Sequence, residues 1–104
     1  MIVKTVDQKV DDFIKDLELT TGTKVSRMID LLERFGSTLG MPYSRSLGNK
    51  LLELRIRGQQ EIRIFYTFHD DRTILLHGFI KKTQKTPAKE LEIARTKLKT
   101  LTTT

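Results

Sequence analysis

Positively charged side chains accumulate on three consecutive apolar segments and in the stretch that follows them. The segments are LLELRIR (51–57), EIRIFYTF (61–68) and TILLHGFI (73–80). The basic residues with candidate roles are Arg55, Arg57, Arg63, Lys81, Lys82 and Lys85. If the segments are neighbouring antiparallel strands, these side chains gather at one end of a sheet, where guanidinium and ammonium groups bind phosphates. The pattern predicts a site for a polyanion.

Arginine, lysine and histidine together fit one reaction class, the cleavage of RNA by its own neighbouring 2′-hydroxyl. The reaction needs a proton acceptor, cations for the charge on the phosphorane, and an acid for the leaving oxygen. Arg55, Arg63 and the three lysines are candidates for stabilising charge. His77, or a lysine whose pKa is lowered by basic neighbours, is a candidate for proton transfer. Two other interpretations stay open: a hydrogen-bonded core histidine, and a basic surface that faces solvent or an acidic protein.

Tyr43 and Arg45 lie in a loop-like stretch just before the first of these segments. An aromatic ring and a guanidinium there can stack on a base and hold a phosphate. The alternative is that both side chains only pin the loop.

The charge distribution supports a localised basic surface. Residues 1–44 carry six basic and seven acidic side chains, residues 45–85 carry nine and four, and the remainder carries four and two. Most of the net charge of +6 therefore lies on the predicted sheet and the loops beside it. Such a surface favours binding to phosphates.

Alternation within the segments predicts how the sheet positions these residues. Leu52, Leu54 and Ile56 share one face of the first strand, so Glu53, Arg55 and Arg57 share the other. In the second strand Ile62, Ile64 and Tyr66 share a face, and Tyr66 is expected in the core. HDDR (69–72) and GQQ (58–60) are expected turns.

Apolar residues at helical spacing predict three helices around this sheet. The first follows a capping-box pattern, Thr5 to Gln8, and contains Val6 to Leu17. The second covers residues 25–35, after a polar break at 20–23, and leads into a loop over residues 36–49. The third begins at Pro87, with Thr86 as its N-cap, and carries an apolar seam of Leu91, Ala94, Leu98 and Leu101 that packs on the sheet or on a partner. Residues 1–4 are at most a short edge strand. The fold class is therefore α+β.

Length and composition indicate one intracellular domain over residues 1–104. The chain has no cysteine, no apolar run of membrane-spanning length and no signal-peptide layout, so we expect a cytoplasmic protein. Its two histidines, His69 and His77, lack a metal-ligand spacing, and there is no glycine-rich phosphate loop or serine nucleophile motif. We expect neither a metal nor a cofactor.

Specific segments resemble a known family. LLELRIR, IRIFYTF and ILLHGFIKKTQKTPAKELEIARTKL, with GMPYSRSL before them, resemble the phage-derived Gp49-like branch of the RelE/HigB toxins, in the RelE/ParE superfamily. The resemblance implies a RelE-like fold, with an N-terminal helical hairpin on a small antiparallel sheet and a C-terminal helix. It also implies the toxin of a type II toxin–antitoxin pair, a metal-independent endoribonuclease that cleaves mRNA on the ribosome and forms a heteromer with a helix-turn-helix antitoxin.

The resemblance also implies roles for individual residues. Arg55 and Arg57 match strand positions at which such toxins carry basic residues along the RNA backbone, and Arg63 matches an arginine of the next strand. Lys81 and Lys82 match basic residues after the last strand. The C-terminal tyrosine or histidine of many relatives has no counterpart after His77. The alternative function is a non-cleaving module of the same fold, such as a ParE-like gyrase inhibitor.

Overall fold

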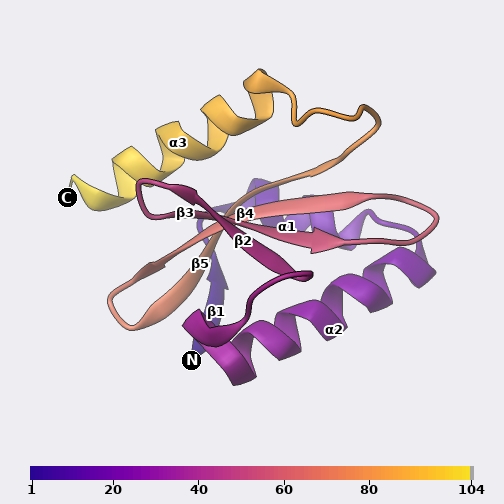
Figure 1. Ribbon diagram of the computed structural model, residues 1–104, viewed down its shortest axis with the longest axis horizontal. Helices are drawn as coiled ribbons and strands as arrows, with labels where there is room; N and C mark the ends of the chain where they lie inside the picture. The colour runs from indigo at the N-terminus through magenta and orange to yellow at the C-terminus, as the bar shows by residue number, and fades with distance from the viewer. Residues whose placement is uncertain (104) are drawn as a thin grey trace.

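The computed structural model describes residues 1–103 and shows one five-stranded sheet with helices on both faces (Figure 1). In chain order its elements are β1 (Ile2–Thr5), α1 (Gln8–Lys15), α2 (Leu19–Phe35), the 3₁₀ turn η1 (Gly36–Thr38), β2 (Ser44–Gly48), β3 (Leu51–Ile56), β4 (Ile62–His69), β5 (Arg72–Ile80) and α3 (Ala88–Thr102). The α+β class and the C-terminal helix are thus confirmed. Within residues 1–103, no helix combines the length and apolarity needed to cross a membrane.

The sheet is mixed, which corrects the expectation of an antiparallel one. Its strand order is β1-β5-β4-β3-β2, and β1 pairs parallel to β5, whereas the other neighbours are antiparallel. The pairing of β1 continues through Val6, whose N–H donates to the Leu75 carbonyl at 2.9 Å. The edge position of β1 was predicted, but a four-residue strand carries no pattern that reveals its direction.

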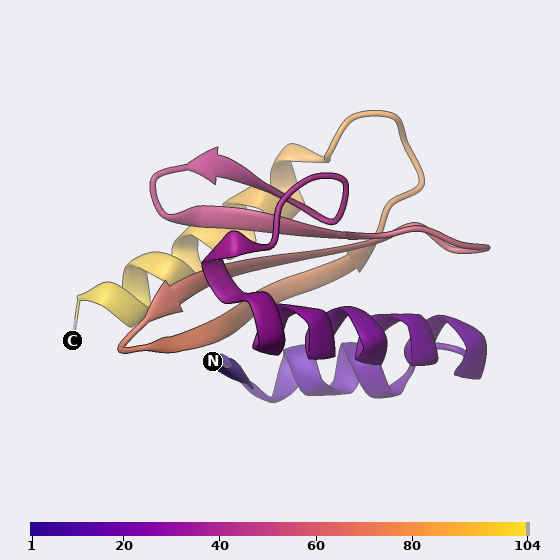
Figure 2. The ribbon, with the colours of Figure 1, turned by 60° about the horizontal axis from the view of Figure 1, so that its bottom comes forward.

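Two separate hydrophobic clusters lie on the two faces of the sheet. The cluster beneath α1 and α2 contains Val10, Val25, Leu32, Leu54, Ile56, Ile62, Ile64, Tyr66 and Leu75. The cluster beneath α3 contains Leu51, Phe65, Ile74, Leu76, Phe79, Ala94 and Leu98. Figure 2 shows α1 and α2 together on one side of the sheet. The seam of α3 therefore packs on the sheet, and the predicted faces of β3 and β4 are confirmed.

Tyr66 is fully buried, as predicted, and its hydroxyl hydrogen-bonds the Ser44 hydroxyl. Burial raises the pKa of the Tyr66 hydroxyl. The contact joins β4 to β2 across β3, so it helps to hold β2 in place, a strand that the sequence did not predict.

β2 lies where a continuous loop was expected. It pairs antiparallel with β3 and is joined to it by a tight turn in which Gly48, Asn49 and Lys50 all have positive φ. The expected turn after β4 is confirmed and uses Asp70 and Asp71, both also at positive φ. Asn, Asp and Gly tolerate this region best, and consecutive residues there match the twist of a hairpin.

The helix starts differ from those predicted. Asp7, and not Thr5, caps α1: its carboxylate accepts from the Val10 N–H at 3.2 Å, whereas Thr5 ends β1 and donates to Asp11. The second helix begins at Leu19, so the stretch 20–23 is helical. Pro87 occupies the N-cap of α3, and the Thr86 hydroxyl instead donates to Glu53.

Replacing Asp7 with alanine should lower the free energy of unfolding at neutral pH by about 1 kcal/mol, the usual cost of a lost N-cap. Burial opposes ionisation of Asp7. Hydrogen bonds from Lys97 and from the Val10 N–H outweigh it and hold the pKa of the carboxyl below its ordinary value. A lowered folded-state pKa stabilises above the unfolded value, about 3.9, and this stabilisation disappears as the pH falls through the folded-state pKa.

Chemical denaturation across this pH range checks the prediction. The gap between the wild type and Asp7→Ala should close in acid. Asp7→Asn keeps a capping oxygen but loses the charge that pairs with Lys97, so at neutral pH its stability should lie between those of the wild type and Asp7→Ala. A gap that stays constant with pH would show that the carboxylate charge is irrelevant.

Candidate nucleic-acid interface

Two rows of paired residues cross the sheet on the face that α3 partly covers. The first row runs from β2 to β5 through Arg45, Glu53, Phe65 and His77. The second row runs from β3 to β5 through Arg55, Arg63 and Phe79. Residues paired across strands point to the same face. The register therefore brings most of the predicted strand residues onto a single surface.

A buried carboxylate lies at the centre of the arginines. Glu53 is 1% exposed, and its Oε1 lies 3.4 Å from Arg45 Nε and 4.0 Å from the Nε atoms of Arg55 and Arg63. Its other oxygen accepts from the Thr86 hydroxyl at 3.4 Å. One carboxylate thus holds guanidinium groups from three strands. The sequence placed Glu53 on this face but gave it no role.

Arg63 is buried beside Glu53 and does not lie at the surface. It is 2% exposed, and its Nη1 donates to Glu61 Oε2 at 2.6 Å and to the Ile62 carbonyl at 3.4 Å. Glu61 also pairs with the exposed Arg57 at 3.7 Å. The arginines outnumber the two carboxylates, so the cluster keeps an excess of positive charge.

Arg55 shows the effect of this excess. Burial lowers the pKa of its guanidinium, and the Arg63 and Arg57 charges lower it further against the opposing pull of Glu53. Its Nε is buried without a hydrogen-bond partner in the part of the chain that the structure describes. A buried N–H without an acceptor is unfavourable, so Arg55 sits in surroundings that favour an added anion.

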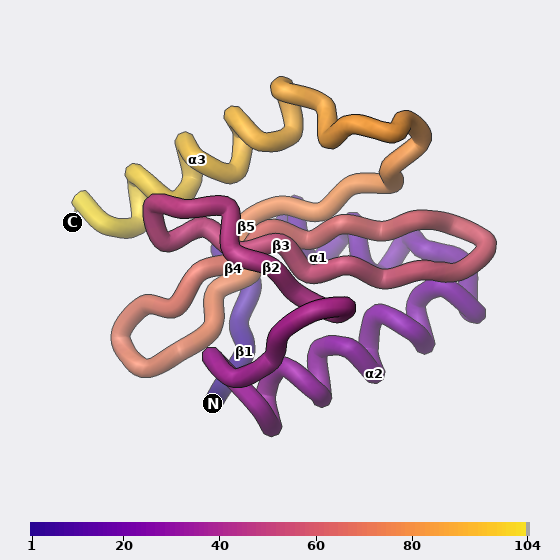
Figure 3. Tube along the Cα trace, viewed as in Figure 1, coloured from indigo at the N-terminus to yellow at the C-terminus, as the bar shows by residue number. Residues whose placement is uncertain are grey.

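The three lysines lie on the loop that leads from β5 to α3 (Figure 3). The Lys81 N–H donates to the Glu61 carbonyl at 2.7 Å, which ties the start of the loop to the end of β4 that carries Arg63. Lys81 Nζ is held by the Gln84 carbonyl at 2.7 Å, whereas Lys82 and Lys85 are exposed. The loop therefore extends the positive charge beyond the sheet.

His77 lies apart from Arg55, because β4 separates β5 from β3. Two strand spacings amount to about 10 Å. His77 Nε2 is 3.1 Å from Glu90 Oε2 of α3, and its ring stacks on Phe79 with centroids 6.2 Å apart. A carboxylate only accepts hydrogen bonds, so the neutral ring carries its proton on Nε2 and leaves the Nδ1 lone pair free.

Tyr43 is 44% exposed and precedes β2, and its carbonyl accepts from the Arg55 N–H at 2.8 Å. A cleft beside it also brings in Lys24 and Arg27 of α2. No sequence pattern indicated these two residues, because helical spacing alone does not show which strand edge a polar helix face meets.

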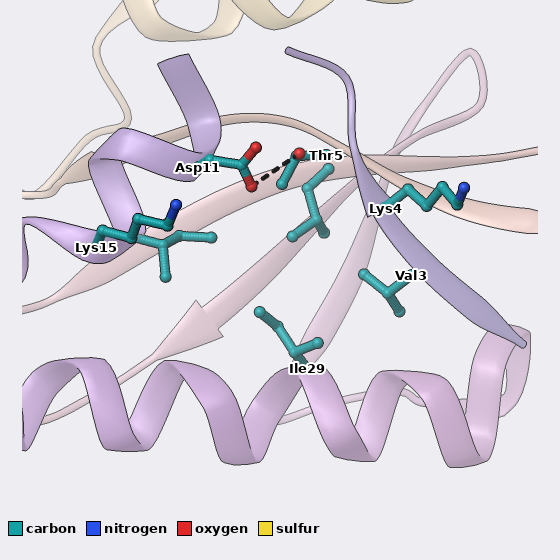
Figure 4. Close-up of a pocket in the computed structure, with 8 residues that line it drawn as sticks. Val3, Lys4, Thr5, Asp11, Lys15 and Ile29 are labelled. Carbon is teal, nitrogen blue, oxygen red and sulfur yellow. Dashed lines mark hydrogen bonds between the residues drawn. The ribbon is translucent and has the colours of Figure 1, made fainter. Parts of the chain in front are cut away.

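Another cleft, of about 470 Å³, lies between β1, α1 and α2 (Figure 4). Lys4, Lys15 and Asp11 contribute its charges, and Asp11 already accepts from the Thr5 hydroxyl at 3.0 Å. It contains no arginine and lies on the face opposite the cluster around Glu53. We assign no function to it.

These features define a small α+β protein with a cationic cluster at one end of its sheet. The family model for phage-derived Gp49-like proteins matches residues 12–99. The chain belongs to this family, which is associated with the toxins of toxin–antitoxin pairs, and the resemblance drawn from the sequence is confirmed. No curated protein matches the chain.

Proposed function

We propose that the protein is the toxin of a type II toxin–antitoxin pair and cleaves mRNA on the ribosome. Family membership supports the toxin assignment. The observation that carries the nucleic-acid target is the excess of cations around Glu53, continued by the exposed lysines of the loop. RNA presents a closely spaced row of phosphates to such a surface. The proposed antitoxin, a helix-turn-helix protein, neutralises the toxin by covering this surface.

In this proposal Arg45, Arg55 and Arg57 bind the RNA backbone, and Lys82 and Lys85 extend the track. Arg55 is suited to a backbone phosphate beside the cut, because it is half-buried and its Nε lacks a hydrogen bond within residues 1–103. A cation that is already oriented and partly shielded from water holds a phosphate more strongly than one in bulk solvent.

Arg63 acts indirectly in this scheme. Its guanidinium is engaged by Glu53, Glu61 and a backbone carbonyl, so its charge reaches a bound phosphate through the field and not through contact. Lys81 has a similar position at the start of the loop, with its ammonium held by the Gln84 carbonyl. Both residues raise the positive potential in which Arg55 works.

Proton transfer falls to His77 in this proposal, with the loop lysines Lys81 and Lys82 as the alternative. The Glu90 carboxylate fixes the imidazole ring and directs its lone pair to Nδ1. Nδ1 accepts the proton of the 2′-hydroxyl, whose oxygen attacks the adjacent phosphate; a 2′,3′-cyclic phosphate forms as the P–O5′ bond breaks, and the leaving 5′-oxygen takes a proton from water. Arg55 and His77 then contact different nucleotides of one RNA strand, because the buried Phe65 and Phe79 lie between them on the sheet.

Induction of the protein in a bacterial host, with mapping of message ends, tests the proposal. The wild type should create new ends within translated regions. His77→Gln should reduce them by at least about 100-fold, the lower range for a lost general base. His69→Gln is the matched control, since His69 is the last residue of β4 and pairs with Asp70.

Growth arrest with intact messages would overturn the nuclease proposal and favour the gyrase inhibitor. Cleavage that persists in His77→Gln would move proton transfer to Lys81 or Lys82.

A further inference from the structure

A cationic cleft of about 340 Å³ lies on the other side of the sheet edge, between α2 and β3. It opens beyond the last residue pair between β2 and β3. The hydrogen bond from the Arg55 N–H to the Tyr43 carbonyl lies next to the cleft, and Ile56 and Arg57 follow along the chain. Figure 1 shows α2 running along this side of the sheet. The cleft is therefore distinct from the face that α3 partly covers, although it shares Arg55 and Arg57 with the cationic cluster.

Four cations and no carboxylate line the cleft: Lys24, Arg27, Arg55 and Arg57. Lys24 Nζ donates to the Arg57 carbonyl at 3.5 Å and so bridges helix and strand. Over residues 1–103, neither Lys24 nor Arg27 forms an ion pair. The positive charge of the α2 wall is thus uncompensated.

The remainder of the lining is apolar and includes one exposed aromatic ring. Met28, Leu31 and Ile56 form a floor, and Tyr43 stands beside it with Pro42. Cations alone suffice for a free anion, whereas a flat base also needs an apolar surface and an aromatic ring. The volume lies at the lower end for ligand sites, which fits a single nucleotide and not a helix.

We propose that this cleft binds one unpaired nucleotide of an RNA strand. Its base packs on Tyr43 and the apolar floor, and its phosphates contact Arg27, Lys24 and Arg57. The inference rests on the proposed function and deepens it, since the strand continues around the β3 edge onto the cationic cluster. Substrate recognition then includes a base that lies outside the cleavage site and must be free of pairing.

Binding of short single strands to the purified protein tests this inference. The probes are a 2′-O-methylated RNA strand and an abasic strand of the same length and charge. The wild type should bind the strand with bases about tenfold more tightly, the expected contribution of one stacked base. Tyr43→Ala should abolish this difference, and Tyr43→Phe should retain it.

Charge variants separate phosphate contact from stacking. Arg27→Ala should weaken binding of both strands by a similar factor. Arg34→Ala is the matched control, because Arg34 is an exposed arginine on the same helix outside the cleft, and it should bind as the wild type does. The Tyr43 side chain makes no hydrogen bond within the described chain, so its variants should fold, which thermal melting verifies.

Equal binding of the two strands by the wild type would overturn the inference. So would selective binding of an alternating Glu-Leu peptide that Arg27→Ala abolishes while RNA binding is unaffected, since the cleft would then be a protein-docking site. Message cleavage in cells distinguishes this failure from failure of the proposed function. If Tyr43→Ala still cleaves messages and the cleavage sites show no base preference, only the proposed nucleotide binding in the cleft is refuted.

Discussion

Replacement of Glu53 with alanine should lower the free energy of unfolding by about 3–5 kcal/mol, the range for removing one partner of a buried ion pair. Arg63, whose side chain is 3% exposed, would lose the carboxylate beside it. Arg45 and Arg55 would lose it too, leaving three guanidinium groups to repel one another. In a domain of this size the melting temperature should fall by at least about 12 °C.

Variants of matched shape separate charge from packing. Glu53→Gln keeps the volume and one acceptor oxygen but removes the charge, so most of the loss should remain. Glu92→Gln, on the exposed side of α3, should change stability by less than about 0.5 kcal/mol. The double variant Glu53→Leu, Arg63→Met removes both buried charges and should recover much of the loss, because an apolar pair needs no compensation.

Thermal and chemical denaturation of the wild type and the four variants give the result. If Glu53→Gln is as stable as the wild type, the Glu53 charge does not hold Arg63 in place, and the cluster is held by Glu61 and packing alone. If the double variant is less stable than Glu53→Ala, the buried ion pair stabilises the fold more than an apolar pair in its place does.

The alternation of apolar and charged residues in β3 and β4 was enough to predict the two faces of the central sheet. A strand has a side-chain period of two, so one slip would invert every position, and the pattern tolerates no other register. The same alternation placed Glu53 among the arginines. It did not show that this carboxylate is buried or that Arg63 is enclosed with it, because burial depends on α3 and the loop, which lie far along the chain.

Local sequence patterns did not predict the elements whose formation depends on tertiary contacts. β2 has the short, polar sequence SRSLG, and its position follows from Arg45 pairing with Glu53 and Ser44 with Tyr66. The start of α2 contains Gly22 and several threonines, which weaken a helix in isolation. Thr21 is nevertheless buried, and its hydroxyl donates to the carboxylate of Glu18, so the first turn forms within the fold.

The site was predictable only in part for a related reason. Charge counting located the cationic region but assigned equal weight to each arginine. In the structure Arg63 is paired and buried, whereas Arg45 and Arg57 are exposed. The contribution of α2, through Lys24 and Arg27, depends on how the helix crosses the edge of β3, which no spacing in the sequence encodes.

The affinity of the protein for single-stranded RNA should depend steeply on salt. Five accessible cations, Arg45, Arg55, Arg57, Lys82 and Lys85, form the proposed track. Each phosphate that a cation neutralises releases condensed counterions, which contributes about −0.7 to the slope of log K against log salt for single strands. Full engagement of these five cations contributes a slope of about −3.5, or a loss of about 100-fold in affinity between about 50 and 200 mM salt, and Lys24 and Arg27 of the proposed cleft would each steepen it by about 0.7.

The double variant Lys82→Ala, Lys85→Ala should make the slope shallower by about 1.4, because two phosphate contacts are lost. Fluorescence anisotropy with a 2′-O-methylated strand, which lacks the nucleophile, measures binding without cleavage. Lys15→Ala with Lys99→Ala removes the same charge from exposed sites on α1 and α3 and should leave the slope near that of the wild type. Equal reductions in both double variants would mean that RNA responds to the net charge of the protein, and the proposed track along β3 and the loop would have to be abandoned.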